Sequence, residues 1–269
     1  MSETIGQPGD PAPPRPLGIG EILSTALQLY RRHWRTLLTI AAVVVVPITL
    51  LHYLFGDLVR TQGETTRNGV VETATWSVGI AGLVAALAGI LMYLVLTGAI
   101  TRAVAAEVAG QDPSVEQSYR FGFHRLGSVL LVSVLVGLAT IGGLILFIIP
   151  GIYIGIRLCV SIEALVVEGR RGTEAMGRSW GLVGGHWWHA FGTVVVGGLL
   201  TGIVNAVITT PFGNTSWFVQ AVAAAVATVI TLPYSALVGV LLYLDLRARK
   251  ERLTMDTLRT DLQTSAAGP

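Results

Sequence analysis

The chain has 269 residues, of which 52% are hydrophobic and 13% are charged, and its formal net charge at pH 7 is +2. Globular proteins carry about 25% charged residues, so this composition indicates a protein in contact with lipid. The small net charge gives no sign of a nucleic-acid-binding surface. The single cysteine, Cys159, excludes an intramolecular disulfide.

The two ends of the chain are polar. Residues 1–16, MSETIGQPGDPAPPRP, lack the basic start, apolar core and cleavage site of a signal peptide, and we expect them to form a disordered tail. Residues 253–269 predict a second loose tail, of which only the first stretch could stay helical. The expected membrane domain therefore comprises residues 17–252.

Long apolar runs follow one another between these tails. A helix needs about 20 mostly apolar residues to cross the hydrocarbon core of a bilayer. Five runs contain no Asp, Glu, Lys or Arg, and a sixth is interrupted only by Arg157 and Glu163. We therefore expect an all-α, polytopic membrane protein with six transmembrane helices. In chain order the runs are residues 37–56, 78–100, 126–150, 151–167, 190–211 and 217–244.

The distribution of arginine predicts how these spans are oriented, because short cytoplasmic loops carry an excess of Lys and Arg. Arginines gather before the first span, between the second and third, between the fourth and fifth, and after the sixth. The connections on the other side are balanced or uncharged. We therefore expect a multi-pass protein with both termini in the cytoplasm.

A short motif occurs twice. The segment RRHWRTLL, which contains His33 and Trp34, is matched 153 residues later by GGHWWHAF, which contains His186 and Trp187. Before each pair, apolar residues recur with the i, i+3, i+4, i+7 spacing of an amphipathic helix. The pair lies where this helix would turn into the membrane, a depth that favours aromatic rings with a polar edge. We expect the histidines to be interfacial rather than metal ligands, because no second set of ligands accompanies them.

A weaker third copy of this pattern begins near Ser114. The sequence therefore predicts three repeats, each an amphipathic surface helix followed by two spans. We expect the surface helices to lie on the cytoplasmic leaflet as a basic collar that prefers anionic lipid. The alternative is that their apolar faces pack against the protein's own spans. The predicted repeats cover residues 18–109, 112–169 and 172–250.

Arg157 and Glu163 are the two ionisable residues inside the spans, and such residues are candidates for function because their burial in hydrocarbon is costly. Six helical residues give a net rotation of about 240°, so the two side chains do not share a face. Each is expected to have a partner elsewhere, such as Asn205, His52 or a lipid phosphate. A structural role and a lipid- or ligand-handling role both stay open.

Motifs for catalysis are missing from the sequence. It contains no Walker-type loop, no G-x-S-x-G elbow and no H-E-x-x-H pair. Many of the 32 glycines lie in the spans, where small residues allow helices to pack closely. We expect no cofactor and no metal ion.

Four segments stand out as a set: PLGIGEILSTALQLYRRHWRTLL, IIPGIYIGIRLCVSIEALVVEG, GTEAMGRSWGLVGGHWWHAFG and LLYLDLRARKE. Together they resemble the membrane domain of glycerophosphoryl diester phosphodiesterases, and more closely its stand-alone relatives in high-G+C bacteria. The resemblance covers most of residues 16–252. It implies a bacterial cell membrane, six spans, and structural weight for Pro150, Gly151, Arg157, Glu168, Arg178, Ser179, Trp180, Asp245 and Arg247.

In those phosphodiesterases the membrane domain accompanies a catalytic barrel that uses acidic residues, a histidine pair and a divalent metal. No part of this sequence resembles that barrel, and HRL at residues 124–126 differs from the His-Arg-Gly context expected there. Glu163 is a further departure, because the resemblance implies a small or apolar residue at its position. We therefore expect no phosphodiesterase activity.

Three functions stay open at this stage. The leading hypothesis is a non-enzymatic integral membrane protein that organises or regulates through membrane lipids with anionic headgroups, a membrane-protein partner or a second copy of itself. The second is a small transporter or lipid-handling permease, since internal repeats and an intramembrane charge are common in that class. The third is a membrane-embedded enzyme acting on lipid headgroups, which requires Arg157 and Glu163 to converge with histidines.

Overall fold

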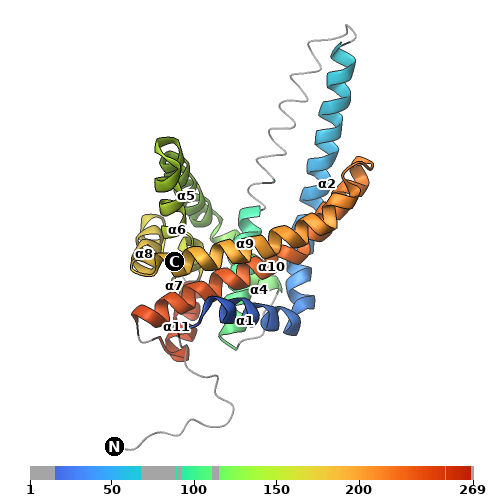
Figure 1. Cartoon of the computed structure of the whole chain (residues 1–269). Helices are drawn as coiled ribbons and strands as arrows, with labels where there is room; N and C mark the ends of the chain where they lie inside the picture. The colour runs from blue at the N-terminus through green and yellow to red at the C-terminus, as the bar shows by residue number, and fades with distance from the viewer. Residues whose placement is uncertain (1–15, 68–88, 90–92, 111–114, 252, 268–269) are drawn as a thin grey trace, which may run out of the picture.

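The computed structural model describes residues 16–67, 89, 93–110, 115–251 and 253–267 of the chain. Within these ranges every regular element is a helix, which confirms the all-α class (Figure 1). The elements are α1 (Ile19–Arg32), α2 (Trp34–Arg67), an unlabelled helix at residues 93–108, α4 (Val115–His124), α5 (Leu126–Leu146), α6 (Ile148–Arg157), α7 (Ser161–Glu168), α8 (Thr173–Val183), α9 (Trp187–Thr209), the 3-10 turn η1 (Thr210–Phe212), α10 (Trp217–Lys250) and α11 (Met255–Ala267).

Five segments within the described part of the chain are long and apolar enough to cross a membrane. They coincide with five of the six expected runs, so these helices are those of a membrane protein. The remaining run, residues 78–100, lies largely outside the described residues, and only its end is seen, in the helix at residues 93–108. The five segments are Trp34–Leu54, Leu126–Leu146, Ile148–Glu168, Trp187–Phe212 and Trp217–Lys250.

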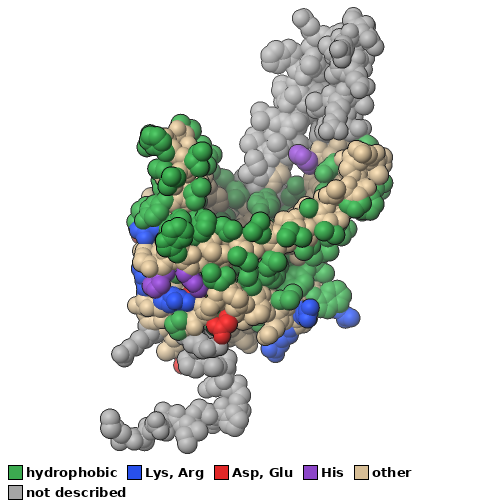
Figure 2. Space-filling view, viewed as in Figure 1, with side chains coloured by type: hydrophobic (Ala, Val, Ile, Leu, Met, Phe, Trp, Pro, Cys, Tyr) green, Lys and Arg blue, Asp and Glu red, His purple; other side chains and the backbone are tan. Residues whose placement is uncertain are grey.

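Helix α10 is the axis of the fold (Figure 1). It packs against α2, α9 and α1, and α9 runs beside it along much of its length. Helices α5 and α6 form a separate hairpin that contacts α7 and α8. Hydrophobic side chains cover this hairpin and α9 in the space-filling view, whereas charged and histidine side chains gather along one edge and the opposite end (Figure 2). The face shown in Figure 2 therefore has a mainly apolar part and a mainly polar part.

Glycines allow the tight hairpin between α5 and α6. A Cβ atom added at Gly143 would lie 2.9 Å from the Cα atom of Gly151, and one added at Gly151 would lie 2.6 Å from the backbone nitrogen of Leu144. Without hydrophobic attraction between helices in lipid, close backbone approach supplies the packing contacts. The structural role of Gly151 is therefore steric, because a larger residue would not fit at this contact between α5 and α6.

The expected span at residues 151–167 is two helices rather than one. Helix α6 ends at Arg157 and α7 begins at Ser161, with a turn at residues 158–160. The hydroxyl of Ser179 in α8 donates to the carbonyl of Arg157 at 2.9 Å and accepts from the amide of Val160 at 3.3 Å. A side chain from another helix therefore pairs with two backbone groups that the break leaves without helical partners.

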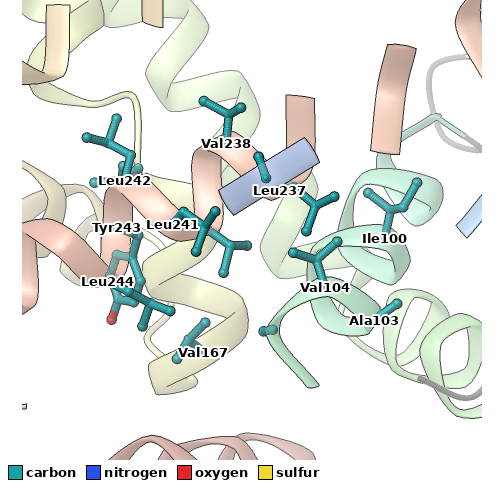
Figure 3. Close-up of a cluster of buried hydrophobic side chains, with 14 of the residues drawn as sticks. Ile100, Ala103, Val104, Val167, Leu237, Val238, Leu241, Leu242, Tyr243 and Leu244 are labelled. Carbon is teal, nitrogen blue, oxygen red and sulfur yellow. The ribbon is translucent and has the colours of Figure 1, made fainter. Parts of the chain in front are cut away.

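The largest buried cluster surrounds the second half of α10 (Figure 3). Its members include Leu237, Leu241 and Tyr243 from α10, Ile100 from the helix at residues 93–108, and Val167 from α7. Residues far apart in the sequence thus share one core at this end of the bundle.

Helix α1 contributes to the same cluster. This contact bears on whether its apolar face meets lipid or packs against the protein's own spans. Ile22 and Ala26 are fully buried, and Tyr30 donates a hydrogen bond to the carbonyl of Ile230 in α10 at 3.1 Å. Part of the apolar stripe of α1 therefore packs against the protein itself, as in the alternative, whereas Leu27 and Trp34 of the same stripe are 41% and 46% exposed. Arg31 and Arg32 on its other face are exposed.

The C-terminal segment also differs from the expectation of a loose tail. Residues 255–267 form α11, which packs against α7. Leu258, Leu262 and Ser265 are almost fully buried, and Leu258 and Leu262 join the core cluster. The sequence is polar on average, but these residues recur at helical spacing and supply one face that can be buried.

Candidate functional site

Three junctions link a short helix to a long apolar one: α1 to α2, α4 to α5, and α8 to α9. The junction residues are His33, Arg125 and His186, with φ/ψ angles of −120°/30°, −100°/6° and −124°/27°. The carbonyl of each accepts a hydrogen bond from the fourth residue on, which begins the second helix. His33, Arg125 and His186 therefore share a similar backbone conformation, but the third junction is longer, since Gly184 and Gly185, with a φ of 85° at Gly185, precede His186.

The side chains at these junctions have different surroundings. His33 Nδ1 contacts a carboxylate oxygen of Glu107, whose side chain is almost fully buried. Burial, together with the nearby charges of Arg249 and Lys250, lowers the pKa of His186 below its ordinary value. His186 is therefore favoured as a neutral ring, and His33 is placed to pair with a carboxylate.

Aromatic side chains border the junctions. Trp34 is 46% exposed and the guanidinium of Arg35 lies over its ring at 5.3 Å. Trp187 stacks with Phe191, and its indole N–H donates to the carbonyl of Tyr153 at 3.3 Å. The two tryptophans of the repeated motif are thus used differently, one at the surface and one in packing.

The guanidinium of Arg157 lies against aromatic rings, and its buried Nε atom has no hydrogen-bond partner among the described residues. Its guanidinium carbon lies 4.3 Å from the ring centroid of Trp180 in α8 and 5.6 Å from that of Tyr153. Such cation–π contacts stabilise a guanidinium more strongly as it is withdrawn from water. Among the described residues no ion pair joins Arg157 to Glu163. The two residues are therefore separate, as expected, but the cause is the break between α6 and α7 rather than the rotation of one continuous helix.

Glu163 lies in α7 against α10. It is 9% exposed, and a Cβ atom added at Gly239 would lie 2.5 Å from its Oε1 atom. Its Oε2 atom is buried and has no hydrogen-bond partner. Gly239 thus provides the space for a carboxyl group that enters the helix interface.

Charged side chains from four segments meet at one end of the bundle. Arg178 in α8 donates to Glu168 at the end of α7, with an Nε–Oε1 distance of 2.8 Å, and to Glu251 after α10, with an Nη1–Oε1 distance of 2.5 Å. The hydroxyl of Tyr243 also donates to Glu168. We call the whole group the Glu168 network, and its members are Glu168, Arg178, Tyr243, Arg247, Glu251 and Asp261.

Arg247 extends the Glu168 network to α11. Its Nη1 atom donates to Asp261 at 2.8 Å and its Nε atom to Glu251 at 3.3 Å. The hydrogen bond from Arg178, the largest cause, lowers the pKa of Glu251 below its ordinary value. For Arg178, burial lowers the pKa, but hydrogen bonds to Glu251 and Glu168 outweigh this effect and raise it overall. Both groups are therefore held in their charged forms.

Asp245 fixes the start of α1 on α10. Its Oδ1 atom accepts from the backbone N–H of Leu17 at 2.6 Å, and Arg249 donates to the Leu17 carbonyl at 2.6 Å and to Asp245 at 2.8 Å. His189 Nε2 lies 2.9 Å from the second oxygen of Asp245. We call this arrangement the Leu17 clamp. It binds both backbone groups of one residue with a carboxylate and a guanidinium.

The residues expected from the sequence are thus divided among several places. Glu168, Arg178 and Arg247 come together in the Glu168 network, whereas Asp245 belongs to the Leu17 clamp and Arg157 and Trp180 pair with each other. Sequence reasoning missed partners such as Glu107, Tyr243, Glu251 and Asp261. The spacing of four between Arg247 and Glu251 was a signal for one of these pairs. Among the described residues, no group of three or more His, Cys, Asp or Glu side chains could hold a metal ion.

Comparison of the chain with protein-family models, with characterised proteins and with solved structures gave no match. The resemblance to the membrane domain of the phosphodiesterases therefore rests on the sequence segments alone.

Proposed function

We propose that this chain is a non-enzymatic integral membrane protein of the bacterial cell membrane, with both termini cytoplasmic, that organises or regulates through anionic lipid or a membrane-protein partner. The observation that carries the proposal is the use of the carboxylates at the polar end. Glu168, Glu251 and Asp261 pair with arginines, and Asp245 binds the backbone of Leu17. A carboxylate committed to ion pairs in this way serves to hold helices together and is poorly suited to acid–base chemistry.

An exposed basic and aromatic border supports the lipid part of the proposal. Arg31, Arg32 and Arg35 are exposed next to Trp34. Trp188, at the beginning of α9, is 77% exposed. Tryptophan favours the headgroup region, and a basic residue near an anionic surface contributes on the order of 1 kcal/mol. We therefore propose the collar as a basic and aromatic border, in which Trp34 of the α1 stripe is exposed while Ile22 and Ala26 are buried.

Six spans in three repeats remain part of this proposal. Its support is the shared backbone geometry at His33, Arg125 and His186, each preceded by a short helix and followed by a long apolar one. Relationship to the phosphodiesterase membrane domain is proposed on the same footing. Its support is the four sequence segments.

One observation favours the second function, a small transporter or lipid-handling permease. The buried Oε2 atom of Glu163 has no partner, and intramembrane carboxyl groups often belong to proton or substrate pathways. The enzyme hypothesis has no such support, because Arg157 lies against Trp180 while Glu163 lies against Gly239.

The test compares the lipid shell of the full-length protein with that of a variant. Wild type and a triple Gln variant of Arg31, Arg32 and Arg35 are extracted from native membranes with a copolymer that retains lipid, and the bound lipids are quantified. We expect anionic lipid to be enriched around the wild type relative to the whole membrane and less enriched around the variant. Glu174→Gln, which changes an exposed carboxylate of α8, serves as the control.

Two results together would replace our proposal by the permease hypothesis. The first is a lipid shell that matches the bulk membrane for all three proteins. The second is solute uptake into proteoliposomes that Glu163→Gln abolishes.

A further inference from the structure

A cavity of about 390 Å³ is lined by residues of the helix at residues 93–108, of α4, of the junction before α5 and of α11, and by no member of the Glu168 network or the Leu17 clamp. Its size falls within the range of about 300–1,000 Å³ found for small-molecule sites. Most of its polar lining is basic. The lining residues that matter here are Arg102, Arg120, Phe121, His124, Arg125 and Ser265.

The three arginines lack acidic neighbours in this cavity. No Asp or Glu is among its lining residues, and no ion pair within the described part of the chain involves Arg102, Arg120 or Arg125. Burial lowers the pKa of Arg102, and burial together with the charge of Arg171 lowers that of Arg125. Positive charge is therefore concentrated at a partly buried place, where an anion would relieve the repulsion.

Two of the arginines are held in position by α11. Arg102 donates to the hydroxyl of Ser265 at 3.0 Å, and Arg125 donates to the Ser265 carbonyl at 2.9 Å. Ser265 is 2% exposed and Arg125 is 8% exposed. The guanidinium of Arg102 also lies 5.2 Å from the ring centroid of Phe121. These contacts fix the side chains before any ligand arrives, which reduces the ordering cost of binding.

The fixed guanidiniums keep donors for a ligand. A guanidinium has five N–H donors, and only one hydrogen bond from each of Arg102 and Arg125 is made to Ser265. Planar guanidinium groups match the geometry of phosphate oxygens and bind them with two parallel hydrogen bonds. Arg120 is exposed at the cavity, so it can approach a ligand from the solvent side.

We propose that this cavity is a binding site for a phosphate group, presented either by a lipid headgroup or by a free phosphate compound. The site lies at the junction where the apolar helix α5 begins, which is the depth of a headgroup. If the phosphate group belongs to a lipid headgroup, the proposal rests on the proposed function and adds the place and the chemistry of one lipid contact. If it belongs to a free phosphate compound, the proposal does not depend on that function.

The experiment uses the full-length protein in nanodiscs of zwitterionic lipid, with binding measured by calorimetry. Three probes are titrated: inorganic phosphate, phosphatidic acid with two hexanoyl chains, and dihexanoylglycerol, which has the same chains and no phosphate. Arg120→Gln removes an exposed donor of the site, and Lys250→Gln removes one positive charge at an exposed residue at the end of α10, outside both the site and the border formed by Arg31, Arg32 and Arg35. Arg120→Gln is expected to weaken binding about tenfold, whereas Lys250→Gln leaves it unchanged.

The probes separate the two sources. Phosphatidic acid that binds much more tightly than inorganic phosphate supports the lipid headgroup, and comparable affinities support a free phosphate compound. The proposal is overturned if neither phosphate probe binds, if dihexanoylglycerol binds as well as phosphatidic acid, or if the two variants weaken binding equally. Anionic lipid enrichment that depends on Arg31, Arg32 and Arg35 could persist in each of these cases, so failure of this site is distinguishable from failure of the proposed function.

Discussion

Removing the charge of Glu168 should destabilise the end of the bundle where α7, α8, α10 and α11 meet. The side chain of Glu168 is 8% exposed and that of Arg247 is 6% exposed, and Glu168 also accepts hydrogen bonds from Arg178 and Tyr243. Removing one partner of a buried ion pair costs about 3–5 kcal/mol. Arg178 keeps Glu251 and is 18% exposed, so water screens part of the loss and we expect about 2–3 kcal/mol.

The assay is reversible unfolding of the full-length protein by SDS in mixed micelles, with the free energy of unfolding compared between Glu168→Gln and wild type. Glu174→Gln is the matched control, because this exposed carboxylate lies in the first turn of α8, where loss of its charge should cost about 0.3–1 kcal/mol. A double-mutant cycle of Glu168→Gln with Arg178→Gln should show a coupling of about 1–2 kcal/mol. Equal losses for Glu168→Gln and Glu174→Gln, with no coupling to Arg178, would refute the structural role of the network.

Three further predictions concern other parts of the chain. In a Cys159→Ala background, a cysteine introduced near residue 64 should be labelled from outside the cell and one near residue 249 only from inside; the reverse pattern rules out cytoplasmic termini. Gly151→Ala should destabilise the protein by about 1–3 kcal/mol, because its Cβ atom would lie 2.6 Å from the Leu144 nitrogen, whereas Gly142→Ala, with no atom within 4 Å, should have little effect. The unfolding free energies of Arg157→Gln and Glu163→Gln should add in the double variant, and recovery of stability there would mean that the two residues are paired.

The membrane class of the fold could be predicted because hydropathy alone determines it. Each of the five apolar segments in the described part of the chain begins or ends within a few residues of an expected run. The break after Arg157 was missed because the residues on both sides of it are apolar. Hydropathy does not show where a side chain takes the place of a backbone group as hydrogen-bond partner. Here the side chain is that of Ser179, which lies 22 residues further along the chain.

The faces of the amphipathic helices could be predicted, but not what covers them. A stripe such as that of Ile22 and Ala26 has the same spacing whether it meets acyl chains or the side of another helix. In α11 the signal was weaker still, because Leu258 and Leu262 lie in a polar segment that reads as solvated. Only the packing against α10 and α7 distinguishes these cases.

The residues of the candidate sites were partly predictable for a related reason. Arg157 was singled out because a charge in an apolar run is costly, and Glu168, Arg178 and Arg247 through the family resemblance. Their partners are distant in the sequence: Tyr243 donates to Glu168 across 75 positions, and Arg178 donates to Glu251 across 73. A single sequence contains no information on such distant pairs. The basic cavity was missed for the same reason, since Ser265 joins Arg102 across 163 positions.

The length of α10 explains why the polar groups gather where they do. Its 34 residues extend about 51 Å at 1.5 Å per residue, whereas the hydrocarbon core is about 30 Å thick. About 14 residues therefore extend beyond the core if the helix stands upright. The half of α10 before Pro233 mixes buried and exposed positions, whereas nearly every residue from Leu237 to Arg247 is buried by other parts of the protein.

Along α10, side chains available to lipid are therefore followed by side chains covered by the rest of the protein. The first half of α10 keeps apolar side chains available to lipid, and the second half, with the buried Asp245 and Arg247, has its surface covered by α1, α7 and the helix at residues 93–108. Charged groups buried in this way need partners, because in hydrocarbon their desolvation would not be repaid. The Leu17 clamp and the Glu168 network supply those partners: Arg249 and the start of α1 pair with Asp245, while Glu168, Glu251 and Asp261 pair with Arg247.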